Sequence, residues 1–114
     1  MKTLENLPIL EFASSDVLRA WLEENHSSSN GVWLRVYKKG SGVPSVTFEQ
    51  VLDEGLCFGW SESKRRSYDE TSYLQKFTPR KSKGTQSARN LARAKALIER
   101  GKMKAVGLEA LGLA

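Results

Sequence analysis

The side chains that could do chemistry in this sequence are cations and aromatic rings, which are interleaved between residues 60 and 100. Lysine and arginine bind phosphate and other anionic groups, and aromatic rings can stack on bases or on another planar ligand. Aromatic residues of strands are more often part of a core, so these rings have two interpretations, a binding platform or buried packing. The candidate binding face comprises Trp60, Lys64, Arg66, Tyr73, Lys76, Phe77, Arg80, Arg89, Arg93 and Arg100.

The only cysteine, Cys57, is a second chemical candidate. Three cations follow it at positions 64–66, and nearby positive charge lowers the pKa of a thiol and favours the reactive thiolate. Cys57 is therefore a candidate reactive thiol, as a nucleophile or a redox sensor. The alternative, which free cysteines favour, is a small buried hydrophobic residue. His26 precedes a serine-rich turn, where a cap or solvent role is favoured over that of a catalytic base.

The sequence contains no other motif for catalysis or metal binding. It has no phosphate-binding loop, nucleophile elbow or metal box, and one Cys with one His cannot form the common four-ligand zinc sites. The adjacent carboxylates Glu23 and Glu24, like Asp53 and Glu54, are expected on helices, where neighbouring side chains do not converge. We therefore expect no cofactor, no metal and no acid–base pair.

Charge is distributed unevenly along the 114 residues. The net charge is +5 and the pI is about 9.5. The first sixty residues carry five basic and eight acidic side chains, giving −3, whereas the remainder carries thirteen basic and five acidic, giving +8. Such an asymmetry indicates which partners a protein binds and does not predict its fold. The expected partner is an anionic polymer, either nucleic acid or an envelope component, or a membrane-associated protein.

A cytoplasmic, water-soluble protein is expected. Hydrophobic residues make up 39% of the sequence, without a run long enough to cross a bilayer. The first residues include Glu5 among few apolar side chains, unlike a signal peptide. A secreted domain of this size would more often carry paired cysteines.

Hydrophobic spacing predicts a single α+β domain over residues 1–114. Residues 9–12 indicate a short strand, interpreted as an edge strand, and alternation over 32–39 predicts a central strand. Serines before a helix at 16–25 supply its N-cap. Thr47 and Gln50 form a capping box, which predicts a helix over 48–58 that Gly59 ends. The inward residues of the first helix are expected to be Val17, Leu18, Trp21 and Leu22.

The second half predicts a hairpin followed by two helices. Strands from Trp60 and over 72–78 flank a turn at 68–71, and Pro79 closes the second strand. A helix over 88–100 ends at Gly101, and a short helix follows at 103–111. The helix at 88–100 is expected to turn Leu91, Ala94, Leu97 and Ile98 inward and Arg89, Arg93 and Arg100 outward. The result is a small, mostly antiparallel sheet packed with three to four helices.

Certain short motifs of the sequence are more specific indicators of a family than these patterns. They are Leu56-Cys57-Phe58-Gly59-Trp60 followed by Lys64, Phe77-Thr78-Pro79-Arg80-Lys81, Ser87 with Asn90, Glu99-Arg100-Gly101-Lys102-Met103, residues 21–26, and residues 31–34 with 37–39. Together they resemble the bacterial YdeI/OmpD-associated family, also called the bacteriocin-protection family. The resemblance spans nearly the whole chain. It implies a small bacterial protein associated with resistance to bacteriocins and cationic antimicrobial peptides, without implying a particular molecular activity.

The sequence departs from that family's pattern in three places. Gln86 stands where the family usually has a Trp, Ser61-Glu62 where it has an apolar residue and an Asp, and Ala105 where a Pro is common. If the Trp contributes to a ligand platform in the family, binding by this chain is weakened or changed. The expected fold is unaffected.

Two classes of function remain. The first is a non-enzymatic protein of the stress or peptide-resistance type, which binds an anionic partner through the hairpin and the helix at 88–100. The alternative is a small enzyme or thiol-based sensor centred on Cys57. The basic face favours the first. Because a protein of net charge +5 repels cationic peptides, we expect its part in resistance to be indirect.

Overall fold

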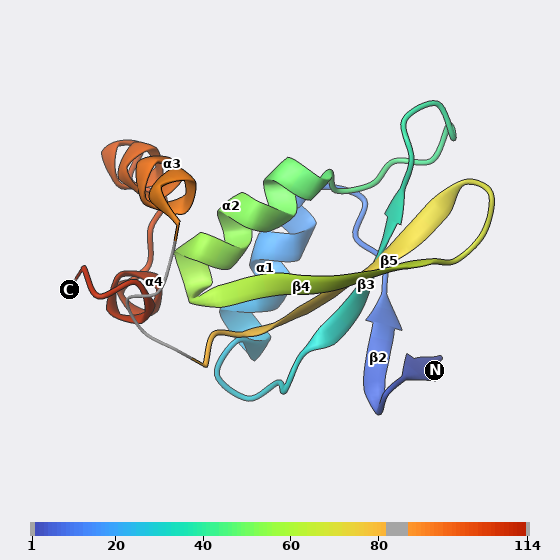
Figure 1. Ribbon diagram of the computed structural model, residues 1–114, viewed down its shortest axis with the longest axis horizontal. Coiled ribbons are helices and arrows are strands. Elements are labelled where there is room, and N and C mark those ends of the chain that lie inside the picture. Colours follow the sequence, from blue (N-terminus) through green and yellow to red (C-terminus); the bar gives the residue numbers. More distant parts are fainter. Residues whose placement is uncertain (1, 82–86, 114) are drawn as a thin grey trace.

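The α+β architecture predicted from the sequence is confirmed. The computed structural model describes residues 2–81 and 87–113, and Gln86 lies outside them. In this part of the chain a five-stranded sheet packs with four helices (Figure 1). The strands are β1 (Thr3–Leu4), β2 (Leu7–Leu10), β3 (Val32–Tyr37), β4 (Trp60–Ser67) and β5 (Ser72–Pro79), and the helices are α1 (Ser15–Asn25), α2 (Phe48–Phe58), α3 (Ala88–Glu99) and α4 (Ala105–Ala110).

The sheet has the order β1-β2-β3-β5-β4 and is mostly antiparallel, with one parallel pair that the sequence did not predict. That pair is β2 with β3. It arises because α1 carries the chain back to the end of the sheet where β2 began, as a crossover helix does. The strand predicted at residues 9–12 is found at Leu7–Leu10, and it is not an edge strand, because β1 pairs with its free side.

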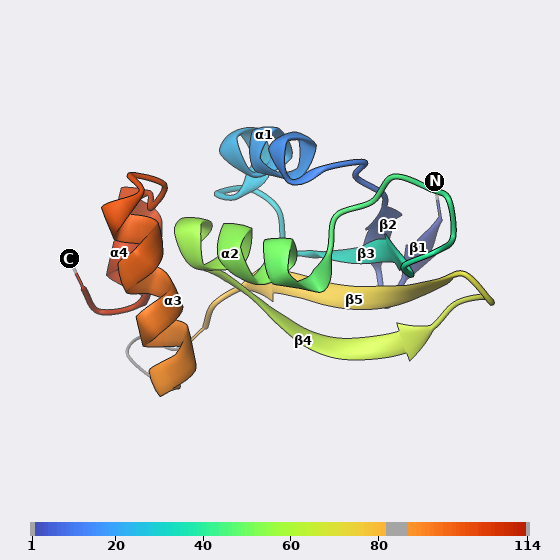
Figure 2. The ribbon, with the colours of Figure 1, turned by 90° about the horizontal axis from the view of Figure 1, so that it is seen from above.

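Most of the core lies between the sheet and the two helices α1 and α2, and α3 adds Ala94 and Leu97 to it. Figure 2 shows α1 and α2 on the same face of the sheet, with α3 and α4 beyond the end of α2. Val32, Leu34 and Val36 of β3 point to this face and are buried in the core cluster. Burial of alternate strand residues against amphipathic helices is what the alternation over 32–39 predicted.

The helix ends follow from capping side chains. In α1, the Ser14 hydroxyl accepts a hydrogen bond from the backbone N–H of Val17. In α2, the Thr47 side chain accepts from the Gln50 backbone while the Gln50 side chain accepts from the Thr47 backbone, which completes the predicted capping box. Gly59 ends α2 with a φ of 74°, a left-handed conformation that glycine adopts without a steric cost.

Two side chains predicted to point inward are exposed. Val17 of α1 is 49% exposed and Ile98 of α3 is 43% exposed. Each helix packs on one side only, and one residue along a helix turns the side chain by about 100°. Because Leu18 and Leu97 fill the buried positions, their chain neighbours face outward.

Glycines allow two close approaches around α2. A Cβ atom on Gly55 would lie 2.9 Å from the carbonyl oxygen of Trp60 and 3.0 Å from the ring of Phe77. A Cβ atom on Gly107 would collide with the carbonyl oxygens of Leu56 and Cys57. The first contact lets α2 sit directly on the hairpin, and the second lets α4 rest on the end of α2.

A membrane-spanning helix is not found in residues 2–81 and 87–113, since none of the helices there combines sufficient length with sufficient apolar character.

Candidate anion-binding site

The candidate site lies on the face of the sheet opposite α1 and α2. Side chains alternate between the two faces of a strand, so Trp33 points away from the helices that cover Val32 and Leu34. Trp33 is opposite Lys76 of β5. The hairpin register extends this face to β4, where Ser61 is opposite Thr78.

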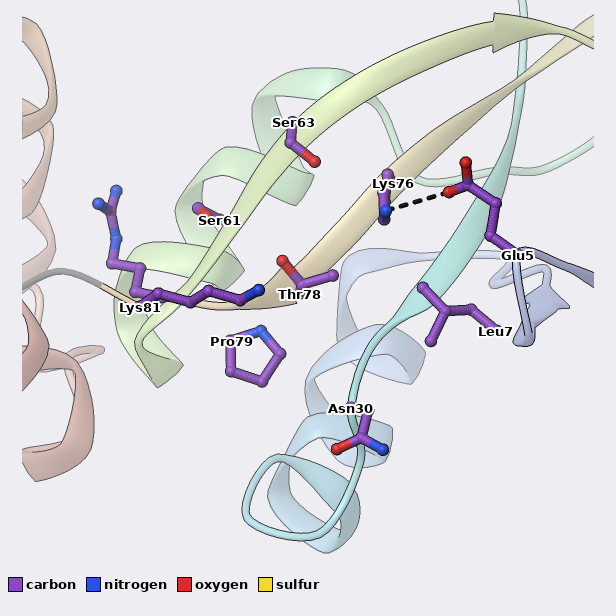
Figure 3. Close-up of a pocket in the computed structure, with 10 residues that line it drawn as sticks. Glu5, Leu7, Asn30, Ser61, Ser63, Lys76, Thr78, Pro79 and Lys81 are labelled. Carbon is purple, nitrogen blue, oxygen red and sulfur yellow. Dashed lines mark hydrogen bonds and ion pairs between the residues drawn. The ribbon is translucent and has the colours of Figure 1, made fainter.

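A groove with a volume of about 720 Å³ opens on this face (Figure 3). Its side chains come from the hairpin, from the segment just after β5, from the amino-terminal turn and from the loop before β3. They include the cations Lys76, Arg80 and Lys81, the hydroxyl groups of Ser61, Ser63 and Thr78, the amide of Asn30 and the carboxylate of Glu5. Ammonium, guanidinium and hydroxyl groups all donate hydrogen bonds to anions, so the groove has the chemistry of an anion site.

An internal carboxylate already occupies part of this groove. The Nζ atom of Lys76 donates a hydrogen bond of 3.0 Å to Oε1 of Glu5, and Figure 3 shows the two side chains pointing toward one another. The hydrogen bond from Lys76 lowers the pKa of Glu5, and the positive charges of Lys64 and Arg66 lower it further.

Trp33 lies beneath Lys76. The ammonium group is 5.8 Å from the centre of the Trp33 ring, a distance at which the ring attracts a cation. Trp33 is 0% exposed, so it supports Lys76 and offers no stacking surface of its own. Two buried donors, Nε1 of Trp33 and Nε of Arg80, have no hydrogen-bond partner within the described residues.

Of the predicted cations of the hairpin, Lys76 and Arg80 line the groove. Arg66 is opposite Leu74, on the same face of the sheet as Lys76, and Lys64 lies at the register shift of β4. Arg80 is held at the base of the hairpin, where its backbone N–H donates to the carbonyl of Gly59. Arg65, between the two β4 cations, belongs to the other side of the strand. Its guanidinium lies 4.1 Å from the Tyr73 ring centre and 5.0 Å from that of Phe48.

The predicted aromatic residues are not part of this site. Trp60 is 1% exposed and Phe77 is 0% exposed, with ring centres 5.1 Å apart on the helix side of the sheet. Tyr73 is half-buried against the same core. The expectation that these rings belong to an exposed binding face is therefore wrong for Trp60 and Phe77, because the alternation of β4 and β5 places them under α1 and α2.

The arginines of α3 do not form one outward stripe. Arg93 turns toward α2, where it donates to Asp53 at 2.9 Å and to Glu49 at 3.0 Å. Arg89 and Arg100 are exposed, on a helix that lies beyond the end of the sheet (Figure 2). Inclusion of Arg93 in the binding face is wrong because opposite charges on α2 engage it.

Some side chains of the groove were missed from the sequence. Ser61, Ser63 and Thr78 could have been found, because a hairpin that pairs residue 61 with residue 78 puts them on the same face as Lys76. Glu5 could not have been found from the sequence, because it is 71 residues from Lys76 and no local pattern connects the two.

Cys57 has the properties of a buried structural residue. It is 0% exposed, and burial raises the pKa of its thiol, which Arg19 offsets only in part. A buried thiol with a raised pKa is poorly nucleophilic, which argues against a reactive thiol here. His26 follows α1, with Nδ1 2.7 Å from the carbonyl oxygen of Leu22, in the cap role that its position favours.

Among residues 2–81 and 87–113, no group of three or more His, Cys, Asp or Glu side chains could hold a metal ion.

Residues 10–110 match the family described as Domain of unknown function (DUF8412). The chain belongs to this family. No curated protein and no solved structure matches the chain. The description of the family names no activity.

The region that matches DUF8412 includes the groove cations Lys76, Arg80 and Lys81, whereas Glu5 precedes it. The carboxylate in the groove thus comes from a segment outside the family match.

Proposed function

We propose that this protein is a non-enzymatic binding protein that holds a phosphate-bearing polymer on the open face of its sheet. One observation carries the proposal. Lys76, Arg80 and Lys81 line one groove with hydroxyl groups of the same hairpin, and Lys64 and Arg66 place further positive charge beside it. Cations and hydroxyl groups are the side chains that most often contact phosphate oxygens.

Binding of this kind is electrostatic and carries little sequence preference. Each phosphate that a cation neutralises releases counterions, so the logarithm of the binding constant falls linearly with the logarithm of salt concentration. Among the described residues of the groove there is no exposed aromatic ring for base stacking, because Trp33 is buried. Oligonucleotides of different composition should therefore bind about equally well.

The test is fluorescence anisotropy with a labelled single-stranded oligonucleotide over a range of salt concentrations. The variant Lys64→Ala with Arg66→Ala should weaken binding and flatten the salt dependence by about one unit of slope for each lost phosphate contact. The matched control is Arg89→Ala with Arg100→Ala, which removes the same charge from α3 and its C-terminal cap. Inorganic polyphosphate as competitor distinguishes a general phosphate site from one that needs nucleotides.

Two results would overturn this proposal. One is an absence of binding at about 50 mM salt, where phosphate contacts are strong. The other is an equal loss of affinity in the β4 pair and the α3 pair, which would show that only the net charge matters.

A role in resistance to bacteriocins or other cationic peptides is part of the same proposal, supported by the resemblance to the YdeI/OmpD-associated family. The net charge of +5 favours an indirect role, exerted through the anionic partner rather than by capture of the peptide. The alternative, an enzyme or sensor centred on Cys57, has no support in the site, because the thiol is buried.

A further inference from the structure

The amino-terminal turn holds Glu5 in a conformation that its own residue type does not favour. Glu5 has a φ of 54° and Asn6 a φ of 64°, and together they form the two-residue turn between β1 and β2. Such turns require positive φ at both central residues and favour Asn-Gly or Asp-Gly. Asn adopts this conformation readily, whereas Glu does so only where its surroundings hold it there.

The surroundings that hold Glu5 belong to the groove. Its carboxylate accepts from Lys76 at 3.0 Å, and Lys64 and Arg66 contribute favourable charge. Glu5 is the single carboxylate among the described side chains that line the groove. Both side chains of the pair are partly exposed, Lys76 at 24% and Glu5 at 42%, so the contact is open to exchange with a ligand from solvent.

We propose that the Glu5 carboxylate occupies the subsite for one phosphate group of the ligand, so that the amino-terminal turn competes with the ligand for Lys76. The inference rests on the function proposed above. A carboxylate and a phosphate both present anionic oxygens to an ammonium group, but a phosphate has more oxygens and can also accept from a neighbouring hydroxyl. Thr78 lines the groove beside Lys76 and supplies such a hydroxyl.

Competition predicts that removal of the Glu5 charge strengthens binding. We compare Glu5→Gln with Glu70→Gln, an exposed position in the turn of the hairpin, because both variants gain one unit of positive charge. With a labelled single-stranded oligonucleotide, Glu5→Gln should bind about two- to five-fold more tightly than Glu70→Gln, the effect of losing one exposed ion pair. Inorganic polyphosphate should show the same order if the subsite recognises phosphate from any source.

A double variant separates competition from long-range charge. In the variant Lys76→Met, the ammonium group for which Glu5 competes is absent. The double variants Lys76→Met with Glu5→Gln and Lys76→Met with Glu70→Gln should therefore bind the oligonucleotide with equal affinity. Circular dichroism of each variant checks that the fold is retained. A full gain in the absence of Lys76 would show that Glu5 acts only through net charge, which overturns the inference.

The carboxyl group of Glu5 also reports on the subsite directly. Its pKa, followed by carbon-detected NMR, should rise toward its ordinary value when polyphosphate saturates the groove, because the ligand then engages Lys76. An unchanged value in the bound protein would overturn the inference even if the affinities agreed with it.

Failure of the inference can be told from failure of the proposed function. If the native chain binds and Glu5→Gln equals Glu70→Gln, the groove binds anions and Glu5 does not compete. If no variant binds at about 50 mM salt, both proposals fail. Binding by Glu5→Gln but not by the native chain would overturn the proposed function, because the native groove would then not hold the polymer at about 50 mM salt.

Discussion

At the scale of residues, the rings that were candidates for a binding platform are packing residues. Trp60 makes an edge contact with Trp21 of α1, with ring centres 5.8 Å apart, so it packs against that helix. Its indole N–H donates to the carbonyl of His26 at 3.4 Å. Large side chains of this kind dominate the free energy of a small core.

We expect Trp60→Ala to lower the free energy of unfolding by about 3 kcal/mol or more, because the change leaves a cavity that its neighbours cannot fill. Chemical denaturation measures the difference, and Tyr68→Ala, at a partly exposed position, is the control with the smaller loss. A loss below about 1 kcal/mol for Trp60→Ala would contradict its place in the core.

Asp69 is the residue whose titration should affect stability most clearly. Its Oδ1 atom accepts from the Ser72 hydroxyl at 2.7 Å and from the backbone of Thr71 at 3.0 Å, while Oδ2 accepts from Arg35 at 2.7 Å. The hydrogen bond from Ser72, with those from Thr71 and the charge of Arg35, lowers the pKa of Asp69 from 3.8 to about 2.

A group with a lowered pKa stabilises the folded state above its unfolded pKa, and that contribution is lost as the pH falls through the folded value. The stability advantage of the native chain over Asp69→Asn should therefore be complete above pH 3.8 and disappear toward pH 2. Thermal unfolding of both proteins across this range measures it. A constant difference throughout the window would show that ionisation of Asp69 is not the cause.

At the scale of elements, a buried ion pair joins α1, α2 and the segment after α3. Arg19 donates to Glu54 at 2.8 Å and to the carbonyl oxygen of Lys102 at 2.6 Å. Its guanidinium also lies 5.3 Å from the Phe58 ring centre. The Glu54 side chain is 3% exposed, so its charge depends on Arg19 for compensation.

We expect Glu54→Ala to cost on the order of 3 kcal/mol, because it leaves the Arg19 charge in a partly buried position without its partner. Asp53→Ala is the control on the same helix. Asp53 pairs with Arg93 at a more exposed site, where an ion pair contributes about 1 kcal/mol or less. Equal losses in urea denaturation would contradict a special role for the buried pair.

The elements were predictable where local patterns specify them. The capping box of Thr47 and the stop at Gly59 predicted α2 with the bounds that the structure shows, and the hairpin followed from alternation around the turn at 68–71. The parallel pairing of β2 with β3 was not predictable in this way, because it depends on where α1 packs. The ion pairs of Arg93 were not predictable either, because its partners lie on another helix.

At the scale of the whole molecule, the two oppositely charged halves of the sequence meet. Acidic residues of α1 and α2 pair with cations from the second half, as in Glu23 with Lys104 at 3.4 Å and Glu49 with Arg93 at 3.0 Å. The acidic half therefore offers less free negative charge than its composition suggests. The unequal halves could be predicted from the sequence, but their mutual neutralisation could not.

This pairing makes direct capture of a cationic peptide unfavourable, because a peptide would have to displace internal cations and approach a molecule of net charge +5. We expect isothermal titration of the purified protein with a cationic antimicrobial peptide to show no binding at about 50 mM salt, where attraction would be strong. The oligonucleotide serves as the positive control. Tight binding that weakens with salt would contradict an indirect role in resistance.

The hairpin has one further property that follows from the position of β4 at the edge of the sheet. Its register shifts between Glu62 and Arg65, and the residues at 64–66 are all cations. A bulge and repelling charges make an edge strand a poor template for another strand. Replacing these cations would therefore remove a barrier to association between copies of the chain. Variants of Lys64 and Arg66 that bind the oligonucleotide more weakly must also be shown, by light scattering, to be no more aggregated than the native chain.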